Sequence, residues 1–405
     1  GLPFADEAEA RYDYQELMTH GVTSFGYSPR GTFDDPSDDF LRNEDRAFNQ
    51  ESAEFGFDLT KSFDTGSLTH SLVYGLEVVQ GEGENRLFDI RNTTLEASSP
   101  IMSFNTDDSW VPTTDTDRVS LYARDDIVIN ENWNAFVGIR HDTTDYSPQV
   151  GPAFTDPTGD TVNDADYGAF VGEVGLSWEF AQNHTVGISV GQGFKAPTLQ
   201  DLYLGAESEI LEDINTGEMF FDYDEISNPN LDPERSTNYE LAYEYSTPDT
   251  LIRLTGFVSI YDELIQSVTE TSAYPQAYTY EACSFFGGCS NRTVTEDEFR
   301  RARNVGSVDL YGFELDSRFL FSESWSASFA YSHVKGEHNN HTENFGLNGF
   351  NAGDELATAS PDSATFGLNY DAPSRKWGGS LFLVWTDEVD ESTDNSFASR
   401  NNGNG

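Results

Sequence analysis

Apolar and polar side chains alternate along most of this chain with a period of two residues. In one clear case, Tyr239 and Leu241 share one face of an extended segment, and Asn238 and Glu240 share the other. Such alternation is typical of a β-strand that has one apolar and one wet face. Its recurrence along the chain predicts about 13 strands and therefore an all-β protein.

The connections between the predicted strands alternate between short and long. Short ones, such as 130–132 and 322–324, contain only a few residues, whereas the long ones are polar and rich in acids. Outer-membrane barrels combine short periplasmic turns with long extracellular loops in the same way. We expect long extracellular connections at 21–50, 80–113, 147–166, 195–234, 265–301 and 338–358.

Aromatic residues gather at the short turns, where they would form a girdle at the level of the lipid headgroups. Together with the unequal connections, they predict an antiparallel transmembrane β-barrel in the outer membrane of a Gram-negative cell. A soluble β-sandwich or propeller would share the alternation but not these two features. The aromatic positions are Trp133, Phe180, Tyr245, Phe321, Trp325, Tyr370 and Trp377.

Composition narrows the function classes. The 405 residues carry a net charge of −49, which argues against nucleic acid as a partner because phosphates attract Lys and Arg. No run of 18 apolar residues is present, so we expect no membrane-spanning helix. The acids suit either a solvated, self-repelling surface or the binding of cations or a basic ligand. The acidic segment 156–166 could bind calcium or be a plain polar loop.

Two cysteines, Cys283 and Cys289, lie on either side of a Gly-Gly turn in a predicted extracellular connection. Two cysteines are too few for a four-ligand zinc site. We expect a disulfide between them, which implies an oxidising compartment.

Two short motifs bracket the long central connection. Pro197 ends the strand before it, because proline cannot donate to the ladder. The first motif is Phe194, Lys195, Ala196 and Pro197, and the second is Asn228, Pro229, Asn230 and Leu231. They resemble the paired FRAP and NPNL boxes of TonB-dependent outer-membrane receptors, most closely those of the heme and hemoglobin branch. The predicted strand segments 121–127, 137–142 and 311–316 also resemble barrel strands of that family.

The resemblance implies a closed barrel of about 22 strands. Residues 1–405 would form part of it, without the N-terminal plug and the C-terminal closing strands. It also implies active uptake of an iron compound with energy from the TonB–ExbB–ExbD complex. Heme or a heme protein is the first candidate for this iron compound, and a ferric siderophore or another metal chelate is the alternative. A passive porin-like barrel is less favoured. No motif of a nucleophile, phosphate loop or metalloprotease is present, so we expect neither an enzyme nor an intrinsic cofactor.

Receptors of the branch that this chain resembles carry a heme-binding histidine between the two boxes, but residues 198–227 contain none. Tyrosinate and imidazole both bind heme iron. The candidate ligands are therefore Tyr203 and Tyr223 between the boxes, and His338 and His341 in the predicted extracellular connection after them. The alternatives are packing roles for the tyrosines and a solvated loop for the histidines.

Overall fold

A computed structural model shows thirteen strands that follow one another in sequence order across one antiparallel sheet, with β4 as a further strand beside β3. The expected all-β architecture of about 13 antiparallel strands is confirmed. The structure describes residues 3–27, 40–94, 100–104, 108–150, 162–207, 210–212, 219–221, 224–283, 289–339, 353, 356 and 362–387.

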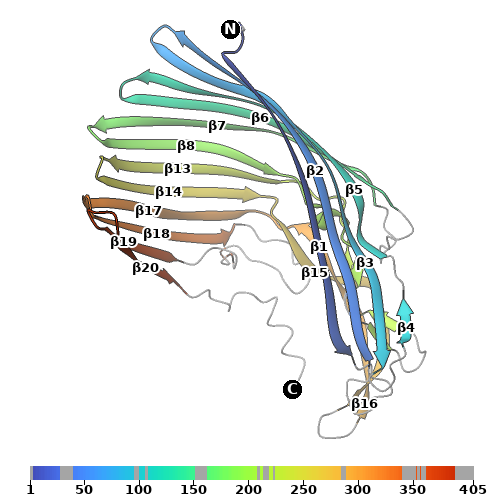
Figure 1. The fold of residues 1–405 in the computed structure, drawn as a ribbon. Helices are drawn as coiled ribbons and strands as arrows, with labels where there is room; N and C mark the ends of the chain where they lie inside the picture. Colours follow the sequence, from blue (N-terminus) through green and yellow to red (C-terminus); the bar gives the residue numbers. More distant parts are fainter. Residues whose placement is uncertain are drawn as a thin grey trace.

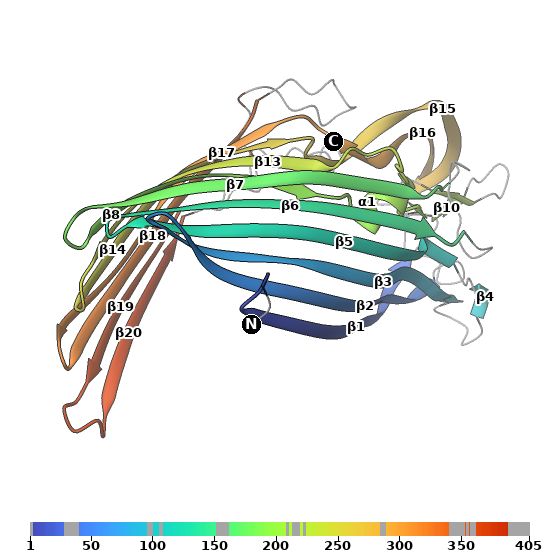
Figure 2. The ribbon, with the colours of Figure 1, turned by 90° about the horizontal axis from the view of Figure 1, so that it is seen from above.

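The sheet forms a curved wall (Figures 1 and 2), with β1 and β20 at its two margins. Its members are β1 (Glu7–Tyr27), β2 (Phe40–Thr65), β3 (Leu68–Thr94), β4 (Pro100–Phe104), β5 (Asp108–Asn130), β6 (Trp133–Pro148), β7 (Ala165–Ala181), β8 (His184–Lys195), β13 (Glu234–Ser246), β14 (Thr250–Asp262), β17 (Val308–Ser322), β18 (Trp325–His338), β19 (Ser363–Asp371) and β20 (Gly378–Thr386).

The remaining elements lie at the loop end of the wall, opposite the short turns (Figure 1). A hairpin of two strands, β15 and β16, extends there into a four-stranded sheet, because β16 pairs with β12 of the central connection and β12 pairs with β9. The elements are α1 (Leu199–Tyr203), β9 (Ala206–Glu207), β10 (Ile210–Glu212), β11 (Met219–Phe221), β12 (Asp224–Ile226), β15 (Ile265–Cys283) and β16 (Cys289–Asn304).

The convex face of the wall is apolar in a broad belt. Phe170 is 68% exposed, Ile139 is 56% exposed and Leu121 is 55% exposed, so large hydrophobic side chains face outward. Phe170 and Phe180 both lie on this face of β7. At the rise per residue and the tilt of barrel strands, they are about 25 Å apart along the barrel axis. A belt of that height matches the hydrocarbon layer of a bilayer.

Aromatic rings meet across the strands at the short-turn end. Trp133 stacks on Trp178 with ring centroids 5.1 Å apart, and Trp325 meets Tyr370 at 4.7 Å. Tyr370 in turn lies 5.1 Å from Trp377. These contacts place the aromatic positions of the sequence pattern side by side on neighbouring strands, as a girdle requires.

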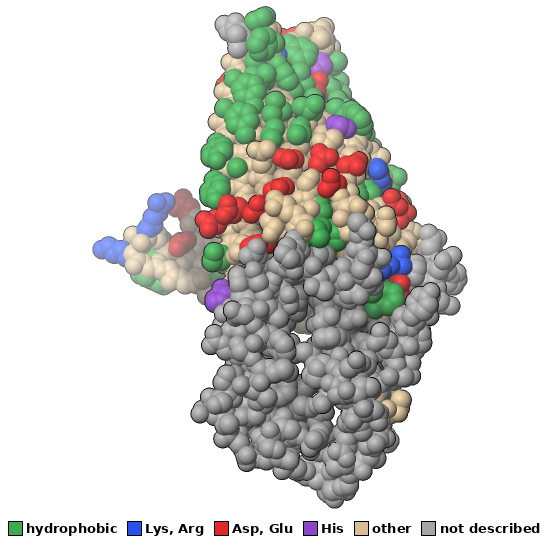
Figure 3. Space-filling view, turned by 90° about the vertical axis from the view of Figure 1, so that its right-hand side faces the viewer, with side chains coloured by type: hydrophobic (Ala, Val, Ile, Leu, Met, Phe, Trp, Pro, Cys, Tyr) green, Lys and Arg blue, Asp and Glu red, His purple; other side chains and the backbone are tan. Residues whose placement is uncertain are grey.

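Beyond the apolar belt, acidic residues face each other on neighbouring strands of the convex face. The register pairs Glu51 with Glu82, Glu82 with Asp115, and Asp117 with Asp145. Figure 3 shows acidic side chains crossing the surface next to the hydrophobic area. Like charges directly opposite one another destabilise a sheet, so this row stands where water and ions can screen it.

Several expected connections are wrong in their bounds. Strands β1 to β5 continue well into the expected loops 21–50 and 80–113, and the expected loop 265–301 is the hairpin of β15 and β16. The central connection contains α1 and short strands. Ladder bonds join backbone groups, so a strand can continue into a polar segment where apolar alternation has ended. Within the described ranges, none of the helices has the length and apolarity needed to cross a membrane.

Candidate functional site

The first box ends β8 and leads directly into α1. Thr198 caps this helix: its hydroxyl accepts the N–H of Asp201 at 3.2 Å, and the Asp201 carboxylate accepts the N–H of Thr198 at 2.9 Å. This reciprocal capping box satisfies donors that a helix start leaves free. A Cβ built on Gly83 of β3 would lie 2.9 Å from Leu199 Cδ1, so glycine at that position lets α1 lie close against the concave face of the wall. Figure 2 shows α1 behind β5 and β6, on the concave side.

Tyrosine hydroxyls fasten both boxes to the wall. Tyr146 on β6 donates to the carbonyl of Pro197 at 3.0 Å, and Tyr167 on β7 donates to the carbonyl of Leu231 at 3.1 Å. Burial raises the pKa of Tyr146, and it raises the pKa of Tyr167 to about 12. Both rings therefore stay neutral donors at physiological pH, and each box is held at its proline or leucine carbonyl.

A small hydrophobic core joins α1 and the two boxes at the loop end of the wall, which we call the mouth. Leu202 and Tyr203 of α1 are both 0% exposed, and they pack with Tyr146 and with Leu231 of the second box. The Tyr203 hydroxyl donates to the carbonyl of Asn163 at 2.9 Å. The two boxes thus share one core with α1.

The second box also holds the hairpin. Asn228 donates its side-chain amide to the carbonyl of Ala302 on β16 at 2.8 Å, and its own N–H bonds the carbonyl of Leu202 at 2.9 Å. Its side-chain oxygen accepts the N–H of Asn230 at 3.2 Å. Nearby, β12 pairs with β16 in parallel. The central connection and the hairpin therefore form one composite structure over the mouth.

An ion pair joins the first box to the strand that follows the second box. Lys195 of the first box lies 2.8 Å from the carboxylate of Glu234, which begins β13 just after the second box. The other oxygen of Glu234 accepts the N–H of Ile265, the first residue of β15, at 2.9 Å. Glu234 is 9% exposed, so this one buried carboxylate ties β8, β13 and the hairpin together.

A cavity of about 530 Å³ lies at the first box. Phe194, Lys195 and Leu199 line it from the box and α1, and Arg118 and Arg140 line it from the wall. Its volume falls within the range of small-molecule sites, about 300–1,000 Å³. The arrangement offers a concave, partly aromatic surface with cationic groups, which suits an organic ligand that carries negative charge.

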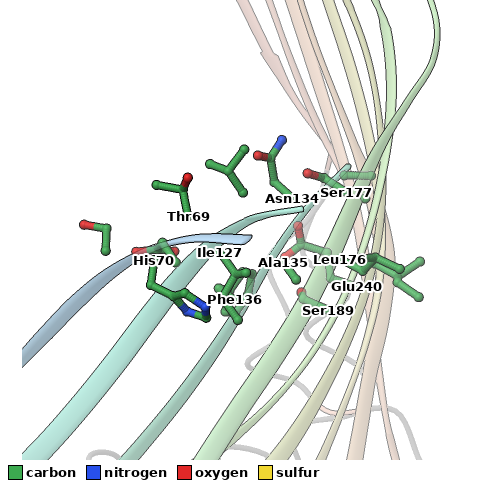
Figure 4. Close-up of a pocket in the computed structure, with 16 residues that line it drawn as sticks. Thr69, His70, Ile127, Asn134, Ala135, Phe136, Leu176, Ser177, Ser189 and Glu240 are labelled. Carbon is green, nitrogen blue, oxygen red and sulfur yellow. The ribbon is translucent and has the colours of Figure 1, made fainter. Parts of the chain in front are cut away.

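A second cavity, of about 350 Å³, lies toward the short-turn end (Figure 4). Its lining comes from β3, β5, β6, β7, β8 and β13 and includes His70, Phe136 and Glu240. Asp125 lies 2.7 Å from one ring nitrogen of His70, and Thr65 lies 2.6 Å from the other. Both ring nitrogens are therefore engaged, and we assign this histidine a structural role.

The structure separates the four candidate heme ligands. Tyr203 is fully buried with its hydroxyl bonded, which favours the packing alternative for this residue. The expectation of an exposed loop at His338 is wrong: it ends β18 opposite Val308 and is 2% exposed. Its carbonyl accepts the N–H of Gly353 at 2.8 Å, a contact with the following segment that the local sequence does not reveal. Tyr223 and His341 lie outside the described residues.

The expected cysteine pair occupies facing strands. Cys283 ends β15, Cys289 begins β16, and the register places them directly opposite each other. Their disulfide stays a prediction. In the part of the chain that the structure describes, no three His, Cys, Asp or Glu side chains come together as a metal site would require.

Residues that sequence reasoning missed carry much of this site. The tyrosines Tyr146 and Tyr167 stand at strand ends beside loops, a position that a surface tyrosine also takes. Arg118 and Arg140 lie on the polar face of their strands, and the alternation indicates that they face inward. Their meeting at one cavity depends on the register of β5 with β6, which places Tyr122 opposite Arg140.

Comparison with known proteins gives a consistent result. Residues 4–404 match the family described as TonB dependent receptor-like, beta-barrel. The hemoglobin-haptoglobin utilization protein B of Neisseria meningitidis serogroup C is 23% identical over 401 residues, which cover 94% of this chain and 45% of that protein. The same protein from serogroup A is 22% identical over the same shares. The chain thus spans less than half the length of these curated relatives.

Solved structures show the same fold. The hemophore receptor HasR of Serratia marcescens, solved as a double mutant with its hemophore and heme, superposes with a TM-score of 0.60 at 13% identity over 96% of this chain and 62% of that one. A mutant of the ferric enterobactin receptor of Pseudomonas aeruginosa gives 0.56 at 16% identity over 94% of this chain and 47% of that one. With a family match over nearly its whole length, this chain belongs to the TonB-dependent receptor-like β-barrel family.

Proposed function

We propose that this chain forms the wall and mouth of an outer-membrane receptor that takes up an iron compound. The observation that carries the proposal is the cavity at the first box, which opens inside a wall whose convex face is apolar over about 25 Å. A receptor for a scarce solute needs such a concave surface on the wet side of a membrane-embedded wall. The ligand would be received there, next to α1.

We propose heme or a heme protein as the ligand. The paired boxes support this, as do relatives whose names refer to hemoglobin-haptoglobin and to a hemophore. A ferric siderophore or another metal chelate is the alternative, because the ferric enterobactin receptor shares the fold at a similar TM-score. At these identities the fold is common to both groups and does not choose between them.

We propose Tyr223 or His341 as the iron ligand that this chain would supply. Tyr203 and His338 are packed, so each would have to leave a buried position before it could reach an iron atom. Burial also raises the pKa of Tyr203, which disfavours the tyrosinate that iron would require. Of the four candidates, the structure therefore offers least support to these two.

We further propose that the rest of the protein supplies what these residues lack for transport. The curated relatives are more than twice as long as the matched region, and β1 and β20 stand at the margins of the described sheet. Residues 1–405 would then be part of a barrel that further strands close. An N-terminal plug would fill it and contact TonB, which draws energy through ExbB and ExbD.

Titration of the purified full-length receptor with hemin tests the heme proposal. We expect a shift of the Soret band on binding, and the absence of any shift would remove heme as the ligand. The pair Tyr223→Phe and His341→Ala should weaken or change the shift. The pair Tyr203→Phe and His338→Ala serves as the matched comparison. If the second pair changes the spectrum and the first does not, the assignment of iron ligands is wrong.

A further inference from the structure

Three cationic side chains surround the cavity at the first box. Arg118 and Arg140 reach it from β5 and β6, and Lys195 reaches it from the box itself. The whole chain has 22 Lys and Arg against 71 Asp and Glu, so composition alone predicts an acidic lining. A gathering of cations at one cavity of such a chain requires a separate explanation.

Each of these cations is paired with an acid, but the acid is the buried member of the pair. The Arg118 side chain is 44% exposed, whereas its partner Glu77, 3.1 Å away, is 13% exposed. Lys195 is 60% exposed and its partner Glu234 is 11% exposed. The exposed charge at the cavity is therefore positive, although the pairs themselves are neutral.

Glu77 also holds the two arginines in place. Its carboxylate lies 3.1 Å from Arg118 and 3.5 Å from Arg140, and Arg11 contributes a third contact at 3.5 Å. Arg140 is fixed further by Asp142, whose carboxylate lies 2.8 Å from its Nε and is itself 13% exposed. A guanidinium held in this way loses little freedom when it binds a second anion, so its geometry favours a carboxylate in the cavity.

Three acids also border the cavity, and they do not cancel this charge. Asp142 is already paired with Arg140 at 2.8 Å. Glu51 and Glu82 are opposite each other in the register of β2 and β3, in the acidic row of the convex face. Tyr14 donates its hydroxyl to Glu51 at 3.2 Å on that side. Because successive side chains of a strand point to opposite faces, these carboxylates point away from Arg118.

We infer that Arg118, Arg140 and Lys195 form a subsite for the carboxylate groups of an anionic iron compound. The inference rests on the proposed function and narrows it to ligands that carry carboxylates. Heme, through its propionates, and carboxylate chelates such as ferric citrate share this chemistry. Neutral or cationic iron chelates do not.

Binding of matched probes to the full-length receptor tests the subsite. Hemin is compared with its dimethyl ester, which keeps the iron porphyrin and loses both carboxylates. Ferric citrate is compared with ferrioxamine B, a cationic hydroxamate chelate. We expect one anionic probe to bind about tenfold or more tightly than its matched partner, since each charge-assisted bond contributes strongly. Which anionic probe binds distinguishes porphyrin from chelate.

Substitutions then test whether the Arg118 side chain binds the carboxylate of the probe. Arg118→Gln should weaken the anionic probe about tenfold or more and should leave the matched uncharged or cationic probe unchanged. Arg118→Lys should restore part of the affinity. Arg253→Gln is the control, because Arg253 pairs with Glu244 at 2.6 Å and does not line the cavity.

The outcomes separate the two proposals. If no iron probe binds, the proposed function fails, and the subsite fails with it. If hemin and its diester bind equally and Arg118→Gln has no effect, the receptor function stands and the carboxylate subsite is wrong. An equal loss with Arg253→Gln would show a general effect of charge and would also overturn the subsite.

Discussion

Replacing Asn228 by alanine should loosen the hairpin of β15 and β16. The change removes the bond to the carbonyl of Ala302 at 2.8 Å and the bond from the N–H of Asn230 at 3.2 Å. Each lost bond is worth about 0.5–1.5 kcal/mol, so the local opening free energy should fall by roughly 1–3 kcal/mol. Amide hydrogen exchange in residues 299–304 of β16, where Asn228 contacts the hairpin, should then become roughly 5- to 150-fold faster.

The same box supplies a matched control. Asn230 is the other asparagine of the box, and its side chain is exposed, whereas Asn228 is buried. Asn230→Ala should leave exchange in residues 299–304 of β16 within about twofold of the native rate, since a surface change costs little. If both variants quicken exchange equally, or if neither does, the second box does not hold the hairpin in the way described.

Three further predictions follow from the same structure. Added salt should raise the thermal midpoint of the receptor, because the facing acids of the convex face repel one another. The double substitution Asp117→Asn and Asp145→Asn should reduce the dependence of the thermal midpoint on salt, because these two acids face each other in the register. An unchanged salt response of this variant would contradict the prediction. In an alkaline titration followed by tyrosinate absorbance, Tyr167→Phe should remove a group with a pKa of about 12, not one near the ordinary value of about 10. Because the pKa is raised in the fold, the stability that Tyr167 contributes is complete below about pH 10 and is lost as the pH rises through about 12. Mass spectrometry without reductant should show the peptide with Cys283 and Cys289 two hydrogens lighter, and two freely alkylated thiols would refute the disulfide.

The strand count and the two faces of the wall were predictable from the sequence. A one-residue slip would turn every side chain of a strand to the other face, so alternation such as that of Tyr239 and Glu240 specifies which side each residue takes. The short turns were also predictable, because aromatic residues such as Trp133 and Trp325 stand directly beside them.

The structure of the mouth was not predictable in the same way. Polar segments such as 80–94 continue as strands because backbone bonds to a neighbour, not apolar side chains, extend them. The burial of Tyr203 and His338 depends on contacts with residues far away in sequence. The cationic lining needs the register of β5 and β6, which single-strand patterns do not contain.

Uptake of radioactive iron by cells that produce the full-length receptor tests the central proposal most directly. Cells are supplied with iron-labelled hemin, or with labelled ferric citrate, in strains with and without TonB. We predict that the receptor raises accumulation of one of these compounds and that loss of TonB abolishes the increase. Equal accumulation with and without TonB would contradict active uptake, and no increase with either compound would contradict a receptor for carboxylate-bearing iron compounds.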